Sequence, residues 1–169
     1  MVGRTVEAKL KAAVILEPDA TLLLVHRDAD SPNANHRHEE INNAATSAGI
    51  TTPLVAVVPV QETEAWLLTD ETAIRQVAKN PRGRNPLTLP SPQRIESTAS
   101  PKEVLKSALL QAAEVTGRRQ RKFVAEFPAQ RRQLLQRLPL GGNLSFLSSW
   151  IRLRDDINHV IATIAASRS

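Results

Sequence analysis

The sequence contains no cysteine and no tyrosine, and only two tryptophans and three phenylalanines among its 169 residues. Without cysteine there is no disulfide, thiolate metal ligand or cysteine nucleophile. With so few aromatic rings, sequence-specific reading of single-stranded nucleic acid by base stacking is not expected. The longest apolar runs, Thr21–Val25 and Leu54–Val60, are too short to span a bilayer, and Met1–Leu16 lacks the apolar core of a secretory signal. We therefore predict a cytoplasmic protein that does not act at membranes.

The overall composition is that of a soluble globular protein, with 41% hydrophobic and 23% charged residues in a length suited to one domain. The net charge of +5 is unevenly distributed. Residues 1–100 hold 10 Lys and Arg against 12 Asp and Glu, a net of −2, whereas residues 101–169 hold 12 against five, a net of +7. This division predicts an acidic, metal-binding centre beside a surface that attracts polyanions. The alternative is a solvated basic helix face.

Two apolar runs, Thr21–Val25 and Leu54–Val60, are typical of strands buried on both faces of a sheet. The segments around them have helical periodicity or helix-capping residues. The predicted helices are Val6–Leu16, Glu39–Ala48, Glu62–Leu68, a helix from the N-cap Asp70 through Ala78, Lys102–Val115, Arg118–Leu138 with an interruption near Pro128, and Leu144–Ala166. Strands that alternate with helices indicate the α/β class with a partly parallel sheet, followed by a helical C-terminal part.

The chain is expected to form one domain from three successive parts. Residues 1–79 form an α/β core, residues 80–101 a proline-rich loop, and residues 102–169 a basic helical part packed on the core. Gly49 is the predicted C-cap of the helix that precedes it. Ser100, followed by Pro101 and an early glutamate, is the predicted N-cap of the first helix in the third part.

Two aspartates, Asp28 and Asp30, follow the first predicted strand. Ligands of open α/β sheets bind at the carboxyl ends of the strands, and residues two apart in a strand point to the same side. Paired carboxylates repel each other unless a cation or proton lies between them. Oxygen ligands without thiolates favour Mg²⁺ or Mn²⁺. We therefore predict a metal site at Asp28 and Asp30, the alternative being two exposed acids in a loop.

The second predicted strand leads to Glu62 and Glu64 at what should be the same edge of the sheet. Either residue is a candidate third carboxylate, with Trp66 packed beneath it. Glu64 is preferred because it directly precedes the apolar residues of the following helix. The alternative is that both glutamates are ordinary helix-start charges and that Trp66 belongs to the core.

Histidines and basic residues supply further candidates. His36 and His38 lie in a predicted polar loop, where they either bind a metal, transfer a proton or are simply solvated. Arginine suits phosphate oxygens, but its stem also covers helix surfaces. The candidate phosphate-binding residues are Arg82, Arg84, Arg94, Lys102, and the dense cluster Arg118, Arg119, Arg121 and Lys122. We expect them to contact the nucleic-acid backbone without sequence specificity.

These segments resemble a known family. The strand ending in His26-Arg27-Asp28-Ala29-Asp30, the helix after it, and the valine-rich strand leading to Glu62-Thr63-Glu64-Ala65-Trp66-Leu67-Leu68-Thr69-Asp70 are similar to the Toprim-related family of uncharacterised bacterial proteins. That family is similar to the nuclease half of the overcoming-lysogenization-defect proteins. The resemblance covers about residues 5 to 155.

The resemblance implies a Rossmann-like Toprim-type core that binds Mg²⁺ or Mn²⁺ for phosphoryl transfer on nucleic acid, as in a nuclease. It implies that Asp28 and Asp30 are metal ligands and that Glu64 is the acidic residue of the Glu-Ala-Trp segment. Lys102 matches a lysine that recurs in the family pattern.

The sequence departs from the Toprim pattern at its beginning. That pattern opens with an apolar strand ending in a glutamate next to a glycine, whereas here Glu7 is the only nearby carboxylate and lies in a predicted helix. The alternatives are an internal start, a fold completed by another subunit, and a protein without nuclease activity. An uncovered sheet edge also predicts self-association, which we expect as a homodimer.

Two other functions are compatible with parts of the pattern. A degenerate Toprim fold would serve as a non-catalytic module that binds nucleic acid or a partner. A phosphatase or sugar transferase would also use Asp-x-Asp, but His26-Arg27 separate the strand from Asp28, and Ser31-Pro32 follow Asp30. Both features differ from the haloacid dehalogenase pattern, so this third function is disfavoured.

Overall fold

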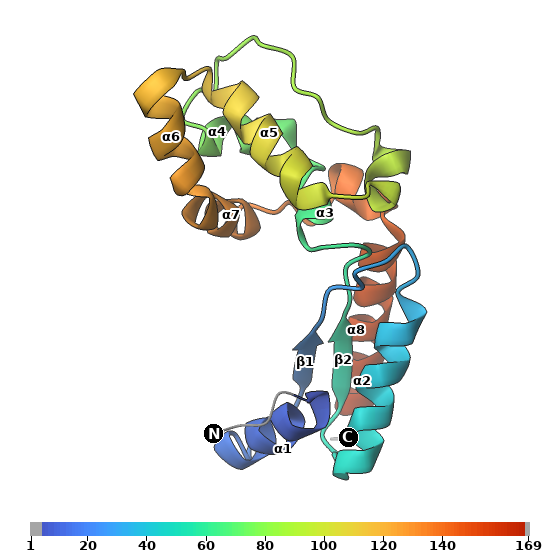
Figure 1. Cartoon of the computed structure of the whole chain (residues 1–169). Helices are drawn as coiled ribbons and strands as arrows, with labels where there is room; N and C mark the ends of the chain where they lie inside the picture. Colours follow the sequence, from blue (N-terminus) through green and yellow to red (C-terminus); the bar gives the residue numbers. More distant parts are fainter. Residues whose placement is uncertain (1–4, 168–169) are drawn as a thin grey trace.

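The computed structural model describes residues 5–167 and shows a mixed α/β fold built mainly of helices (Figure 1). Its strands, β1 (Leu23–His26) and β2 (Leu54–Val57), form a two-stranded parallel sheet. Leu23 pairs with Leu54, and His26 pairs with Val57. The α/β class and the parallel pairing of the two predicted strands are therefore confirmed.

Helices pack on both faces of the sheet, although one face is covered only over β2. Helices α1 (Val6–Leu16) and α2 (Asn35–Ala48) pack on one face, where Leu10, Ile41 and Ala56 belong to one buried cluster. On the other face α8 (Ser148–Ser167) packs against β2, with Leu153 and Val55 in a second cluster. The last helix of the chain therefore returns to the sheet (Figure 1).

A separate helical part lies above the sheet in Figure 1. It consists of α3 (Glu64–Leu67), α4 (Glu71–Val77), α5 (Pro101–Ala113), α6 (Gly117–Ala125) and α7 (Phe127–Gln136). Ile74, Leu105, Leu109 and Leu134 form the centre of its core, each with 2% or less of its surface exposed. The helices α3 and α4 therefore pack with α5 and α7, although they belong to residues 1–79, the predicted α/β core.

The strands differ from the prediction in length and burial. The paired residues are Leu23–His26 and Leu54–Val57, so the first strand starts later and the second ends earlier than predicted. Val58 and Val60 lie beyond the paired residues but are still buried. Leu24 is 60% exposed, so the expectation that both faces of the first strand are buried is wrong. The physical reason is that α8 covers β2 and leaves the same face of β1 open.

Several helix boundaries follow from local capping. Thr5 accepts a hydrogen bond from the amide of Ala8 at the start of α1, whose predicted bounds are confirmed. Asp70 caps α4 through the amide of Ala73, as predicted. Gly49 ends α2 with a φ of +67°, a conformation that favours glycine. Helix α2 begins at Asn35 rather than at the predicted residue 39, because Asn33 caps its first amide.

The early start of α2 corrects the prediction that His36 and His38 lie in a loop, since both are on the helix. The predicted loop of residues 80–101 contains a short 3₁₀ helix, η1 (Pro92–Ser97). A second one, η2 (Gly142–Phe146), precedes α8, which therefore begins four residues later than predicted. The break near Pro128 is confirmed and separates α6 from α7. Among the described helices, none has the length and apolar character needed to cross a membrane.

Candidate functional site

The loops that follow the two strands meet at Asp28 and Thr63. The amide of Thr63 donates a hydrogen bond of 2.8 Å to Oδ1 of Asp28, and the Thr63 hydroxyl donates a second one of 2.7 Å to the same oxygen. Nε2 of His26 lies 2.9 Å from the Thr63 hydroxyl oxygen. Because the hydroxyl proton is directed at Asp28, His26 is the donor in this contact. The parallel sheet therefore brings the residues after both strands together, as ligand-binding edges do.

Glu64, the first residue of α3, is held by a cation from a distant helix. Its side chain is 6% exposed, and its Oε1 accepts a 2.7 Å hydrogen bond from Nε of Arg131 on α7. A buried carboxylate requires such a partner, because loss of water is costly for a charge. The pair therefore joins α3 to α7 and fixes the position of the Glu64 carboxylate.

Glu62 caps the helix α5 from the loop after β2. Its Oε2 accepts a 3.0 Å hydrogen bond from the amide of Lys102, in the first turn of α5. Ser100 occupies the N-cap position, as predicted, but its side chain makes no capping hydrogen bond. A carboxylate at a helix N-terminus satisfies an amide that has no partner within the helix and is favoured by the helix dipole. This cap places Lys102 beside the acidic residues.

A shared hollow of about 320 Å³ lies among these groups. It is lined by Asp28, Glu62, Glu64, Lys102, Phe127, Pro128 and Arg131. No buried side-chain oxygen in the described part of the chain lacks a hydrogen-bond partner, so the second oxygen of Glu64 is reached from solvent. The second oxygens of Asp28 and Glu62 also have no partner among the described residues. Each carboxylate thus uses one oxygen structurally and keeps one free.

The free carboxylate oxygens are of the ligand type that hard divalent cations prefer. Mg²⁺ is commonly held by one or two carboxylates, with water and substrate oxygens completing its shell. Within residues 5–167 no group of three acidic or histidine side chains is close enough to hold a metal ion by itself. The arrangement therefore fits an ion held by one or two of the three carboxylates, rather than one enclosed by protein ligands.

Asp30 lies outside this hollow. The strand ends at His26 and Asp30 has a φ of +54°, so the alternation expected to align Asp28 and Asp30 does not extend this far. The Asp30 side chain is 67% exposed and accepts a 3.1 Å hydrogen bond from Arg37, which also pairs with Glu40. Asp30 is therefore not grouped with Asp28, whereas Glu62 is.

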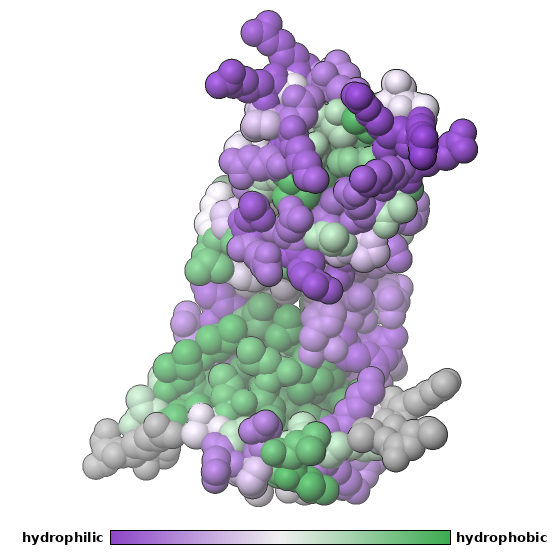
Figure 2. All heavy atoms as spheres, turned by 90° about the vertical axis from the view of Figure 1, so that its left-hand side faces the viewer, coloured by the Kyte–Doolittle hydropathy of each residue, from purple (hydrophilic) through white to green (hydrophobic). Residues whose placement is uncertain are grey.

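The basic cluster of α6 does not line the hollow. Arg118, Arg119, Arg121 and Lys122 are exposed, and none of them forms an ion pair with a described residue. They belong to the upper part of the molecule, which is mainly hydrophilic in Figure 2. This leaves their charges free for a ligand that approaches from solvent.

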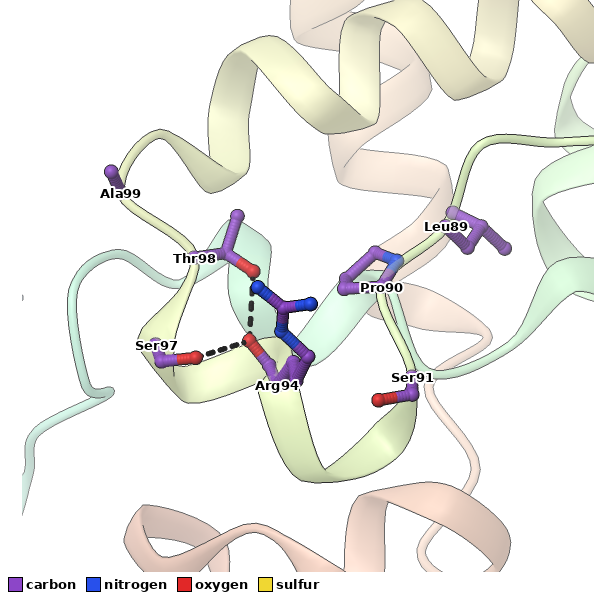
Figure 3. A pocket seen from close by; sticks show the side chains of 7 residues that line it. All are labelled: Leu89, Pro90, Ser91, Arg94, Ser97, Thr98 and Ala99. Atoms are coloured by element: carbon purple, nitrogen blue, oxygen red, sulfur yellow. Dashed lines mark hydrogen bonds between the residues drawn. The ribbon is translucent and has the colours of Figure 1, made fainter.

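The other predicted phosphate-binding residues are dispersed. Arg94 lines a separate hollow of about 470 Å³ beside η1, whereas Lys102 lines the acidic one. Figure 3 shows the hydroxyls of Ser97 and Thr98 directed at the Arg94 carbonyl oxygen, to which both donate. Those hydroxyl protons are therefore committed to backbone. Arg94 is the only charged residue among those that line this hollow.

The histidine pair is also separated. His36 is exposed, whereas His38 is 6% exposed and lines a hollow with Arg152 and Asp156 at the edge of β2. Burial lowers the pKa of His38, the nearby Arg152 cation lowers it further, and Asp156 partly opposes them. Trp66, expected beneath the third carboxylate, is core: its ring meets Trp150 edge-on, and its Nε1 donates to Ser149.

Sequence reasoning missed Thr63, His26 and Arg131. Thr63 directly precedes Glu64, so its place after a strand end was the available signal. Arg131 is one of several arginines on α7 and has no local feature that sets it apart. Comparisons with protein-family models, with curated proteins and with solved structures found no match to this chain.

Proposed function

We propose that this chain is a Toprim-like protein that transfers phosphoryl groups on nucleic acid with Mg²⁺ or Mn²⁺, in the manner of a nuclease. The observation that carries the proposal is that Asp28, Glu62 and Glu64 line one hollow, each with one oxygen free. The parallel pairing of β1 and β2, which brings the two loops together, supports a Toprim-type core.

In this proposal Asp28, together with Glu62 or Glu64, holds the ion, which would supply an activated water and stabilise charge at phosphorus. Thr63 keeps the Asp28 carboxylate in place through two hydrogen bonds. Lys102 and Arg131 border the same hollow and would bind phosphate oxygens. The cations of α6 would hold the nucleic-acid backbone by charge, without reading its sequence.

The test is a calorimetric Mn²⁺ titration of the wild type and of Asp28→Asn. Asparagine keeps an acceptor for both Thr63 hydrogen bonds and removes the negative charge, so the variant is expected to fold and to lose Mn²⁺ binding. Asp30→Asn is the matched control and should retain Mn²⁺ binding, because its carboxylate lies outside the hollow. Equal affinity in the wild type and Asp28→Asn contradicts the proposal.

Catalysis is tested separately by incubating supercoiled plasmid with the wild type and Mn²⁺. Nicking that disappears in Asp28→Asn and persists in Asp30→Asn supports a nuclease. Glu64→Gln, which keeps an acceptor for Arg131, should also lose activity if Glu64 rather than Glu62 is the second ligand.

The second candidate is a non-catalytic module that binds nucleic acid or a partner protein. Two observations favour it. One oxygen of each carboxylate already accepts a hydrogen bond from a protein donor. Within residues 5–167, no three acidic or histidine side chains are close enough to hold a metal ion together. Plasmid retardation without cleavage, with equal mobility for the wild type and Asp28→Asn, would establish this function instead.

A further inference from the structure

The strand β1 has a free edge. Its amides at Leu23 and Arg27 donate to Pro53 and Val57, next to and within β2. Residues in a parallel strand alternate in the side to which they direct their N–H and C=O groups, so those of Leu24 and His26 point away from β2. No other described strand pairs with β1. The edge therefore presents backbone donors and acceptors in the pattern that a further strand would use.

A hollow of about 230 Å³ runs beside this edge. Val6, Leu10 and Ala13 of α1 line it on one side, and Val25 of β1 lines it on the other. A strand added to β1 would direct every second side chain towards α1. The hollow thus fits small or branched apolar side chains at alternate positions of an extended segment.

The opposite face of the edge is also apolar and open. Leu24 pairs in register with Val55, but Val55 is 2% exposed under α8 while Leu24 is 60% exposed. Ile161 of α8 is 53% exposed. Figure 2, which views the molecule from the β1 side of Figure 1, shows a broad hydrophobic area in the lower part of the molecule. Contiguous apolar surface of this kind marks an interaction site.

The charged residues of the hollow define the chemistry of its occupant. Lys9 and Arg27 line it, and no acidic residue does. Arg27 pairs with Glu40, whereas Lys9 forms no ion pair with any described residue. A segment that carries a carboxylate complements this positive border. A symmetric pair of copies would instead bring the same cations from both sides to one interface.

We propose that the free edge of β1 binds an extended segment of another protein, which adds a third strand to the sheet and carries alternating apolar side chains with an acidic residue beside Lys9. The backbone of the segment would form hydrogen bonds with Leu24 and His26. The hollow beside α1 would select apolar side chains, and Lys9 would select an acidic side chain in the segment. The inference concerns a surface distinct from the acidic hollow and does not depend on metal binding.

The test uses a labelled synthetic peptide of about nine residues, in which valine and threonine alternate and glutamate flanks them. Fluorescence anisotropy measures its affinity for the full chain. Two matched peptides serve as controls: one with lysine in place of glutamate, and one with backbone N-methyl groups on the edge-facing residues. We expect the lysine peptide to bind about fivefold more weakly. The methylated peptide should bind more than about tenfold more weakly, because it cannot pair with a strand.

The variant Lys9→Glu tests whether the positive charge of Lys9 selects the peptide. It should not disturb the core, because Lys9 is exposed. It should reverse the preference, so that the lysine peptide binds more tightly than the glutamate peptide. A failure of all peptides to bind, equal binding of the parent and methylated peptides, or an unchanged preference in Lys9→Glu overturns the proposal. A homodimer in light scattering that the peptide does not dissociate also overturns it, since the occupant would then be a second copy.

Discussion

Nε of Arg131 donates a 2.7 Å hydrogen bond to the buried carboxylate of Glu64, across 67 positions of the chain. Arg131 lies on α7 and Glu64 opens α3, so this pair joins α7 to the start of the first helix after β2. Both residues also line the acidic hollow. One ion pair therefore stabilises the fold and places an acid and a cation at the candidate site.

Removal of Arg131 should destabilise the protein. In Arg131→Ala the Glu64 carboxylate stays buried without its cation, which we expect to lower the free energy of unfolding by about 2 kcal/mol. Urea unfolding measures this change. Arg132→Ala, at the exposed neighbouring residue, is the matched control and should stay within about 0.5 kcal/mol of wild type. Equal stability of the two variants would show that the pair contributes little.

Glu96 should make stability depend on pH in the acidic range. Its carboxylate accepts hydrogen bonds from the amides and hydroxyls of Ser148 and Ser149 at the start of α8. Burial alone would raise the pKa of Glu96, but the hydrogen bonds from Ser149 and Ser148 outweigh it, so the pKa lies below its ordinary value of 4.5. A carboxyl with a lowered pKa stabilises the fold above the unfolded pKa, and this contribution disappears as pH falls through the folded pKa.

The variant Glu96→Gln measures that contribution. At neutral pH it should lower the free energy of unfolding by about 1 kcal/mol, because glutamine is a weaker cap than a carboxylate. The difference from wild type should shrink as pH falls below 4.5. Urea unfolding at neutral pH and at about pH 3 makes the comparison. A difference that is constant with pH would exclude the carboxylate charge as its source.

His38 should give a second pH dependence at higher pH. Burial and the Arg152 cation lower its pKa below 6.5, so the unfolded chain binds a proton more readily than the folded one. Stability therefore decreases as pH falls below 6.5, until the folded pKa is reached. His38→Gln should remove this slope in urea unfolding measured across that range. His36→Gln, at an exposed site two residues earlier on α2, should leave the slope in place.

The α6 cluster should determine how binding to double-stranded DNA varies with salt. Arg121→Gln combined with Lys122→Gln should weaken binding and reduce the slope of log affinity against log salt by about one for each phosphate that is no longer neutralised. Titrations at several salt concentrations measure the slope. Lys11→Gln removes a charge from α1, in the other part of the molecule, and should leave the slope unchanged. Equal slopes for the double variant and Lys11→Gln would place the DNA-binding surface elsewhere.

Local sequence patterns determined the features that depend on only a few neighbouring residues. The bounds of α1 follow from its periodicity and the Thr5 cap, and the start of α4 follows from the Asp70 cap. Gly49 ends α2 because its φ of +67° favours glycine. Two apolar runs joined by a helix were enough to predict parallel strands.

The tertiary structure alone decided which of these features meet. Glu62 caps α5 across 40 positions although Ser100 occupies the N-cap, because the loop after β2 reaches the helix start. Asp30 turns away to Arg37, and Arg131 reaches Glu64, through interactions that no local pattern encodes. Leu24 looks like a core residue in sequence and is exposed because α8 covers only the neighbouring strand. Capping and periodicity are set within a few residues, whereas partners and burial depend on how distant segments pack.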